Sequence, residues 1–289
     1  MRVTVIVAAL VGVMGLTACV NNSGVAEFTR YQQSFDRGLI IGESVLDRLA
    51  VAERDLGRAE LPALDPAAPS FDPTRARYYV DTVEPPITAS LRASLALVAD
   101  YNQAVAALAN GESAEALATR LNLIGGGALQ VATKVSTLAA GQGAGQLAGL
   151  ATSLANPLNA LTPLAKRAFV IRTQSAFREE VVARKGDVQA VIQALINATP
   201  EIFNVIALPI AQSHRSVLGN TPFTEEETEM LTALQRDLAN LVILLEASNV
   251  ALDAAVEAIA EGRSAPSLAG FAAATDELNA VARAARAAF

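Results

Sequence analysis

Residues that commonly carry out catalysis or bind metal are scarce in this sequence. The 289 residues include one cysteine, Cys19, and one histidine, His214. A zinc site of the usual histidine and cysteine composition needs several such ligands, so this chain cannot build one alone. The sequence also lacks the G-x-S-x-G, H-E-x-x-H and phosphate-loop motifs of hydrolases, zinc proteases and nucleotide-binding enzymes. We therefore predict that the protein is not an enzyme and has no cofactor or metal.

A cluster of glutamates at residues 225–229 has a structural explanation. Thr224 and Glu227 have the spacing of a capping box, and carboxylates are favourable at the positive end of a helix dipole. The cluster therefore predicts the start of a helix. His214 and Arg215 lie near the expected end of the preceding helix, where a capping or solvated role is expected.

The cysteine follows a segment typical of exported proteins. Arg2 supplies a positive charge, and residues 3–16 form an almost unbroken apolar run. The run is shorter than the ~20 apolar residues of a membrane-spanning helix, so it predicts a signal peptide. It ends in the motif Leu16-Thr17-Ala18-Cys19. This motif resembles the lipobox of bacterial lipoproteins.

The resemblance implies a processing route and a location. In that class the cysteine thiol receives a diacylglyceryl group, the chain is cut before the cysteine, and the new amine is usually acylated. We therefore expect residues 1–18 to be a signal peptide, 19–25 a lipidated tether and 26–289 a single helical-bundle domain. In enteric bacteria an aspartate after the cysteine favours the inner membrane. Val20 here favours the outer membrane, with the protein in the cell envelope facing the periplasm.

Composition predicts the fold class. Removing Arg2 with the signal peptide changes the formal net charge from −7 to −8, and an acidic body argues against nucleic acid as a partner. There is no tryptophan, and runs of β-branched and aromatic residues are few. Alanine and leucine recur at helical spacing. The sequence thus predicts an all-α protein, a bundle of long antiparallel helical hairpins.

Apolar periodicity and capping residues give the expected helices. Thr162-Pro163 and Thr199-Pro200 each predict the start of a helix. Pro209 predicts a kink in the second of these helices. Gly125-Gly126-Gly127 predicts either a helix break or the close approach of another backbone. The expected helical ranges are 26–58, 74–83, 87–109, 114–140, a stretch ending at 161, 163–198, one after 200, 225–261 and 267–288.

An internal similarity relates two parts of the chain. Residues 104–118 align without gaps to residues 255–269, with nine of fifteen positions identical. In each copy a helix is expected to end at a glycine, Gly111 or Gly262, and a serine is expected to start the next. Either a long helical hairpin was duplicated, or the two segments converged on one favourable turn.

Two segments depart from the rest of the chain in charge. Between residues 121 and 165 the only charged residue is Lys134. We expect this segment to be buried all round at the centre of the bundle; the alternative is a hairpin that enters a bilayer, as in α-helical pore-forming toxins. The next segment is locally basic and is either a solvated face or a set of contacts to lipid headgroups. Its six cations are Lys166, Arg167, Arg172, Arg178, Arg184 and Lys185.

These observations favour a lipid-anchored envelope lipoprotein that acts as a structural or interaction module. Its expected partners are the membrane, reached through lipid on Cys19, and an envelope protein whose identity the sequence does not give. The alternatives are a membrane-inserting protein that uses residues 121–165 and a periplasmic carrier of an apolar ligand between its helices.

Overall fold

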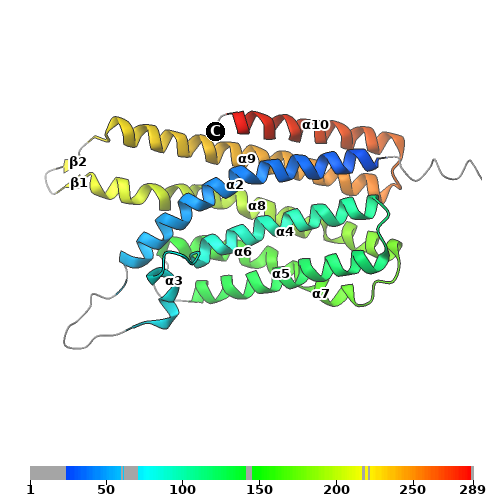
Figure 1. The fold of residues 1–289 in the computed structure, drawn as a ribbon, viewed down its shortest axis with the longest axis horizontal. Coiled ribbons are helices and arrows are strands. Elements are labelled where there is room, and N and C mark those ends of the chain that lie inside the picture. The colour runs from blue at the N-terminus through cyan, green and yellow to red at the C-terminus, as the bar shows by residue number, and fades with distance from the viewer. Residues whose placement is uncertain are drawn as a thin grey trace, which may run out of the picture.

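The computed structural model describes residues 24–59, 61, 71–140, 145–216, 219–220 and 222–287, most of them helical (Figure 1). The predicted signal peptide and Cys19 lie outside these residues. The prediction of an all-α bundle is confirmed. The elements in chain order are α2 (Val25–Ala59), η1 (Pro73–Arg75), α3 (Ala76–Tyr79), α4 (Pro86–Ala109), α5 (Ala114–Ala140), α6 (Gly145–Leu161), α7 (Pro163–Ala168), α8 (Gln174–Ser213), β1 (Arg215–Ser216), β2 (Gly219–Asn220), α9 (Glu225–Ala260) and α10 (Ala265–Ala287).

Helix α9 forms where capping and periodicity predict it. The Glu227 backbone N–H donates to Thr224 Oγ1 (3.2 Å), and the Thr224 backbone N–H donates to Glu227 Oε2 (2.8 Å). This is the expected capping box. The apolar residues that recur along α9 at steps of three and four face the core, and a similar buried stripe, which we call its seam, runs along α4. The buried seam residues of α4 are Ile87, Leu91, Ser94, Val98, Tyr101, Val105 and Leu108.

The same pattern of helix contacts occurs in two sets of three helices. Helices α2, α4 and α5 correspond to α8, α9 and α10. Within each set the first helix packs on the second and the second on the third; between the sets, α2 packs on α9 as α8 packs on α4. The sets differ in how the third helix of each meets the first helix of the other set. Helix α10 packs directly on α2, whereas α6 lies between α5 and α8. This repeated contact pattern covers three helices in each set, more than the hairpin in which the two similar sequence segments lie.

The two similar turns share a left-handed glycine and a closing hydrogen bond, but they differ at the next residue, because Arg263 also has a left-handed backbone (φ of +61°) and Glu112 does not. Gly111 and Gly262 both have left-handed backbones, with φ of +74° and +68°. The next residue in each turn donates its N–H five residues back, from Glu112 to the Ala107 carbonyl (3.1 Å) and from Arg263 to the Ala258 carbonyl (2.7 Å). The prediction that each hairpin turns at its glycine is confirmed.

The sequence prediction for residues 163–198 is wrong. Helix α7 ends at Ala168, and α8 starts at Gln174 after Thr173, whose Oγ1 accepts the Ala176 N–H (3.1 Å). The apolar run of residues 168–171 just before Thr173 led to the prediction of one continuous helix, so this N-cap was missed. The start predicted at Pro200 is wrong as well, because α8 continues through Pro200 and Pro209 to Ser213. Its buried face continues beyond Pro200, so tertiary packing outweighs the lost helical hydrogen bond. In residues 74–83 the structure has the short η1 and α3 in place of one helix.

Helix α5 continues through its three glycines, which decides between the two predicted alternatives. A Cβ added at Gly125 would lie 2.1 Å from the Ala165 backbone nitrogen, whereas one added at Gly126 or Gly127 would meet nothing within 4 Å. Helix α7 therefore packs directly on α5 at Gly125. The expectation that this region is buried all round is wrong for α5. Its outer face is open to solvent, with Leu123 65% and Leu129 54% exposed.

Candidate lipid-facing site

Four segments meet at the end of the bundle where α2 begins (Figure 1). Gly24 lies against Leu268, in the first turn of α10. Arg263, in the α9–α10 turn, donates to the carbonyl of Ala109 at the end of α4 (2.9 Å). The side chain of Gln174, at the start of α8, donates to the Glu112 carbonyl in the α4–α5 turn (2.7 Å). The α7–α8 connection therefore lies at the same end as the start of α2.

The α7–α8 connection presents two apolar side chains to solvent. Phe169 is 69% exposed and Val170 is 67% exposed, the highest values for large apolar side chains in the described part of the chain. The residues on either side, Ala168 and Ile171, are each only 5% exposed. Phe169 and Val170 donate their N–H groups to carbonyls of α7. The connection is thus fixed at both sides while its tip points outward.

Cations flank this tip along the chain, and the structure divides the six predicted headgroup contacts into two groups. Lys166, Arg172 and Arg178 are exposed and form no ion pair with any described residue. Arg167 makes one long contact, 3.9 Å to Glu180. Lys166, Arg167 and Arg172 lie within three residues of Phe169 or Val170 along the chain, and Arg178 lies in the second turn of α8.

The remaining two predicted cations are already paired. Arg184 lies 3.0 Å from Glu180 and 3.2 Å from Asp187, and hydrogen bonding to Glu180 raises the pKa of Arg184. Lys185 forms an ion pair with Asp253 of α9. The ion pairs of Arg184 join neighbouring turns of α8, and the ion pair of Lys185 joins α8 to α9. We therefore assign both cations a structural role and exclude them from the candidate site.

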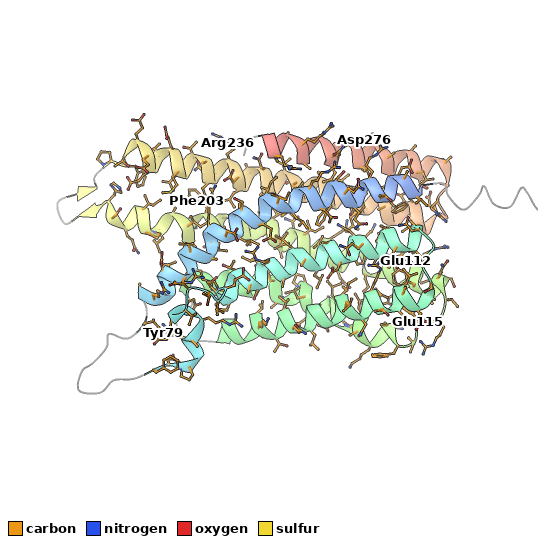
Figure 2. All side chains as sticks on the ribbon, in the orientation of Figure 1. Tyr79, Glu112, Glu115, Phe203, Arg236 and Asp276 are labelled. Carbon is orange, nitrogen blue, oxygen red and sulfur yellow. The ribbon has the colours of Figure 1, made fainter. Side chains whose placement is uncertain are left out.

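A shallow pocket of about 470 Å³ lies between the start of α5 and the connection. Phe169 and Arg172 line one side, and Glu115 lines the other. Figure 2 shows Glu112 and Glu115 at this end of the bundle and Tyr79 at the other end. Glu112 is paired with Arg120 at 2.9 Å. The exposed carboxylates beside the four cations are Glu115 and Glu179, so the tip retains a local excess of positive charge in an acidic chain.

The buried carboxylate of Glu53 was not identified from the sequence. It accepts the backbone N–H groups of Ile87 (2.9 Å) and Thr88 (2.8 Å), together with the hydroxyls of Thr88 (2.8 Å) and Tyr78 (3.3 Å). Burial raises the pKa of Glu53, and these hydrogen bonds oppose that rise. Because its oxygens are occupied by the first turn of α4, Glu53 serves as a long-range helix cap.

His214 also has a structural role. Its Nε2 lies 2.8 Å from Glu227 Oε2, and its ring packs edge-on against Phe223 with centroids 5.1 Å apart. The hydrogen bonds from His214 and Thr224 lower the pKa of Glu227 to about 2. No group of three or more histidine, cysteine, aspartate or glutamate side chains that could hold a metal occurs among the described residues.

An apolar groove of about 410 Å³ lies between α2, α8 and α9, far from the α7–α8 connection. It is open to solvent along the surface of the bundle, and the ion pair between Arg48 and Asp237 (2.9 Å) lies beside it. The groove is lined by Arg48, Val51, Ala52, Asp55, Ile206, Pro209, Ile210, Met230, Leu231 and Leu234.

Among the described helices, α8 alone is long and apolar enough to cross a membrane by length and composition. It packs against α6, α9, α4 and α2, and 44% of its most apolar 18-residue window is buried. These contacts identify α8 as a core helix of the bundle.

The sequence revealed the cations of the site but not its apolar tip. A continuous helix over 163–198 would place Phe169 and Ile171 on ordinary helical faces, so the exposed pair could not be recognised. The available signal was the sequence Lys166-Arg167-Ala168-Phe169-Val170-Ile171-Arg172 followed by the cap Thr173. The chain matches no protein-family model, no curated protein and no solved structure.

Proposed function

We propose that this protein is a bacterial envelope lipoprotein, tethered through lipid on Cys19, whose helical body is a structural or interaction module without catalytic activity. The observation that carries the proposal is the motif Leu16-Thr17-Ala18-Cys19 after an apolar segment, in a chain with no other cysteine. Two or three acyl chains would hold the protein on a membrane, because each buried CH₂ contributes ~0.8 kcal/mol.

The start of the folded body supports this assignment. Helix α2 begins at Val25, and Gly24 already packs on Leu268. The five residues that follow Cys19 up to Gly24 reach at most roughly 18 Å when extended. A lipid on Cys19 would therefore hold the α2 end of the bundle next to the bilayer.

The absence of catalytic chemistry is part of the proposal. The buried carboxylate of Glu53 caps α4, and the histidine pairs with the carboxylate that caps α9. Glu53, His214 and Glu227 are thus used by helix termini, and none of the three converges with a nucleophile at a pocket.

The proposal is tested by the N-terminal chemistry of the protein made in a bacterial host. Mass spectrometry of the purified chain should show an N-terminus at Cys19 carrying diacylglycerol, and a clickable fatty acid should label the protein. Cys19→Ser should abolish both results and leave the precursor uncut. A mature N-terminus at another residue, or a free Cys19 thiol, would refute the proposal.

A carrier of an apolar ligand is the second candidate, supported by the groove between α2, α8 and α9. An apolar cleft of this kind suits a hydrocarbon chain, with Arg48 at its edge for a polar end. Native mass spectrometry should then find a co-purifying lipid that Met230→Arg removes. The membrane-inserting alternative has less support, because α5 and α6 pack on each other and on the core helices α4 and α8.

A further inference from the structure

We propose that the α7–α8 connection is a second membrane contact, in which Phe169 and Val170 enter the interfacial layer of an anionic bilayer and the neighbouring cations bind lipid phosphates. We call residues 166–172 the membrane tip. The inference rests on the proposed lipid anchor for its geometry, since the anchor brings this end of the bundle to the bilayer.

The position of the membrane tip is the first step. Gly24 touches the first turn of α10, the α9–α10 turn binds the end of α4, and the α4–α5 turn binds Gln174 at the start of α8. These contacts connect the tether to the membrane tip through one continuous surface. A bundle held at Gly24 therefore presents the tip towards the same bilayer.

The shape of the tip is the second step. Phe169 and Val170 cannot turn inward without exposing Ala168 and Ile171, which are packed in the core. Helix α7 is held in turn by fully buried Leu164 and by the contact of its backbone with Gly125. An exposed aromatic and an adjacent β-branched residue held in this way form a fixed apolar projection, as expected of a side-chain pair that enters the headgroup layer.

Charge is the third step and identifies the kind of surface. Lys166, Arg167 and Arg172 flank the apolar pair Phe169 and Val170 within the tip, and Arg178 follows in the second turn of α8; the exposed carboxylates of this region are Glu115 and Glu179. The apolar pair is complementary to the acyl chains of a bilayer, and the cations beside it are complementary to anionic headgroups. At the opposite end of the bundle the exposed aromatic pair differs, because Phe71 packs on Tyr79 with ring centroids 5.3 Å apart.

The chain is suited to a direct test, because lipidation of Cys19 would leave the mature protein without a free thiol. Val170→Cys, in the lipidated protein, accepts an environment-sensitive fluorophore at the tip and retains Phe169. Val80→Cys is the matched control, since it places the same dye at an exposed valine in the segment that follows α3, at the far end. Each labelled protein is reconstituted in vesicles of neutral lipid or of neutral lipid mixed with phosphatidylglycerol.

We expect the dye at position 170 to shift to the blue on anionic vesicles, to be quenched by brominated acyl chains and to be protected from iodide, while the dye at position 80 stays aqueous. In the Val170→Cys background, Phe169→Ser should lower the ratio of membrane-bound to free tip about tenfold. Lys166→Gln with Arg172→Gln should lower it about thirtyfold on anionic vesicles and little on neutral ones. Arg236→Gln with Arg283→Gln changes the net charge equally at sites away from the tip and should leave the ratio unchanged.

The anchor and the tip fail separately in this design. A wild-type protein that takes the thiol dye, or that does not float with vesicles, refutes the proposed lipid anchor. A protein that floats while position 170 remains as accessible to iodide as position 80 overturns the membrane tip. Protection of position 170 in native envelopes but not in lipid vesicles also overturns it, and would assign the tip to a protein partner.

Discussion

Replacing Gly125 by alanine should destabilise the bundle, and replacing Gly127 should stabilise it, although both glycines lie in the same helix. In a helix interior, Gly→Ala alone contributes about 0.5–1 kcal/mol of stability. At Gly127 a Cβ meets nothing within 4 Å, so this gain should appear in full. At Gly125 the Cβ would lie 2.1 Å from the Ala165 nitrogen, where only a movement of the α7 backbone can make room.

The expected cost at Gly125 follows from that displacement. Overpacking a core typically costs about 1–3 kcal/mol, and a clash with backbone lies at the upper end of that range. After the helical gain is subtracted, Gly125→Ala should lose about 1–2 kcal/mol. The two variants should therefore differ by about 2–3 kcal/mol, or roughly 4–12 °C in Tm. Urea and thermal unfolding of the mature protein, followed by far-UV circular dichroism, measure both.

The comparison also tests how α7 is positioned. Because α7 leads into the membrane tip, Gly125→Ala should change the spectrum of the dye at position 170, and Gly127→Ala should not. Equal stability of the two variants, or a gain in both, would show that α7 does not pack on Gly125. It would then remove the support that fixes the tip.

Three further results are expected. Glu53→Ala should cost about 2–5 kcal/mol in urea unfolding, because it leaves two buried backbone N–H groups of α4 unpaired, whereas Glu53→Gln keeps one acceptor oxygen and should cost less. The pKa of Glu227 in the folded protein, about 2, lies below its ordinary value of 4.5. The free energy of unfolding that the ionised side chain contributes is therefore complete above pH 4.5 and is lost as the pH falls towards 2. Glu227→Gln should remove this dependence and flatten the acid side of a plot of unfolding midpoint against pH. Thr173→Ala removes the N-cap of α8 and should cost about 1 kcal/mol in the same unfolding assay, and no loss would show that α8 starts elsewhere.

Local signals predicted the parts of the fold that depend on neighbouring residues. The capping box of α9 and the two hairpin turns are set within a few residues of Thr224, Gly111 and Gly262, and all three were predicted correctly. The seams of α4 and α9 follow from repeats of three and four residues. Such features can be read from sequence because the physical cause lies within one or two helical turns.

The errors arise where a distant part of the chain decides. Pro200 should end a helix by local rules, but the buried face of α8 continues on both sides of it. Glu53 caps a helix that begins 33 residues later in the chain, and no local pattern announces such a cap. Lys185 and Arg172 are both cations of the same basic segment. Lys185 is paired with Asp253 of another helix, whereas Arg172 has no ion-pair partner among the described residues. The cations of the candidate site were therefore predictable as a set, but not which of them remain unpaired.

A second membrane contact would change what the lipid anchor can do. A body tethered only through Cys19 can rotate about its short linker and presents any side to a partner. A body also held at Phe169 and Val170 stands on the bilayer in one orientation. Helix α2, 35 residues long, spans about 50 Å along the bundle, and its distal half lines the apolar groove. The same two contacts that fix one end at the membrane would therefore hold the groove some tens of ångströms away, facing the aqueous space where an envelope partner could reach it.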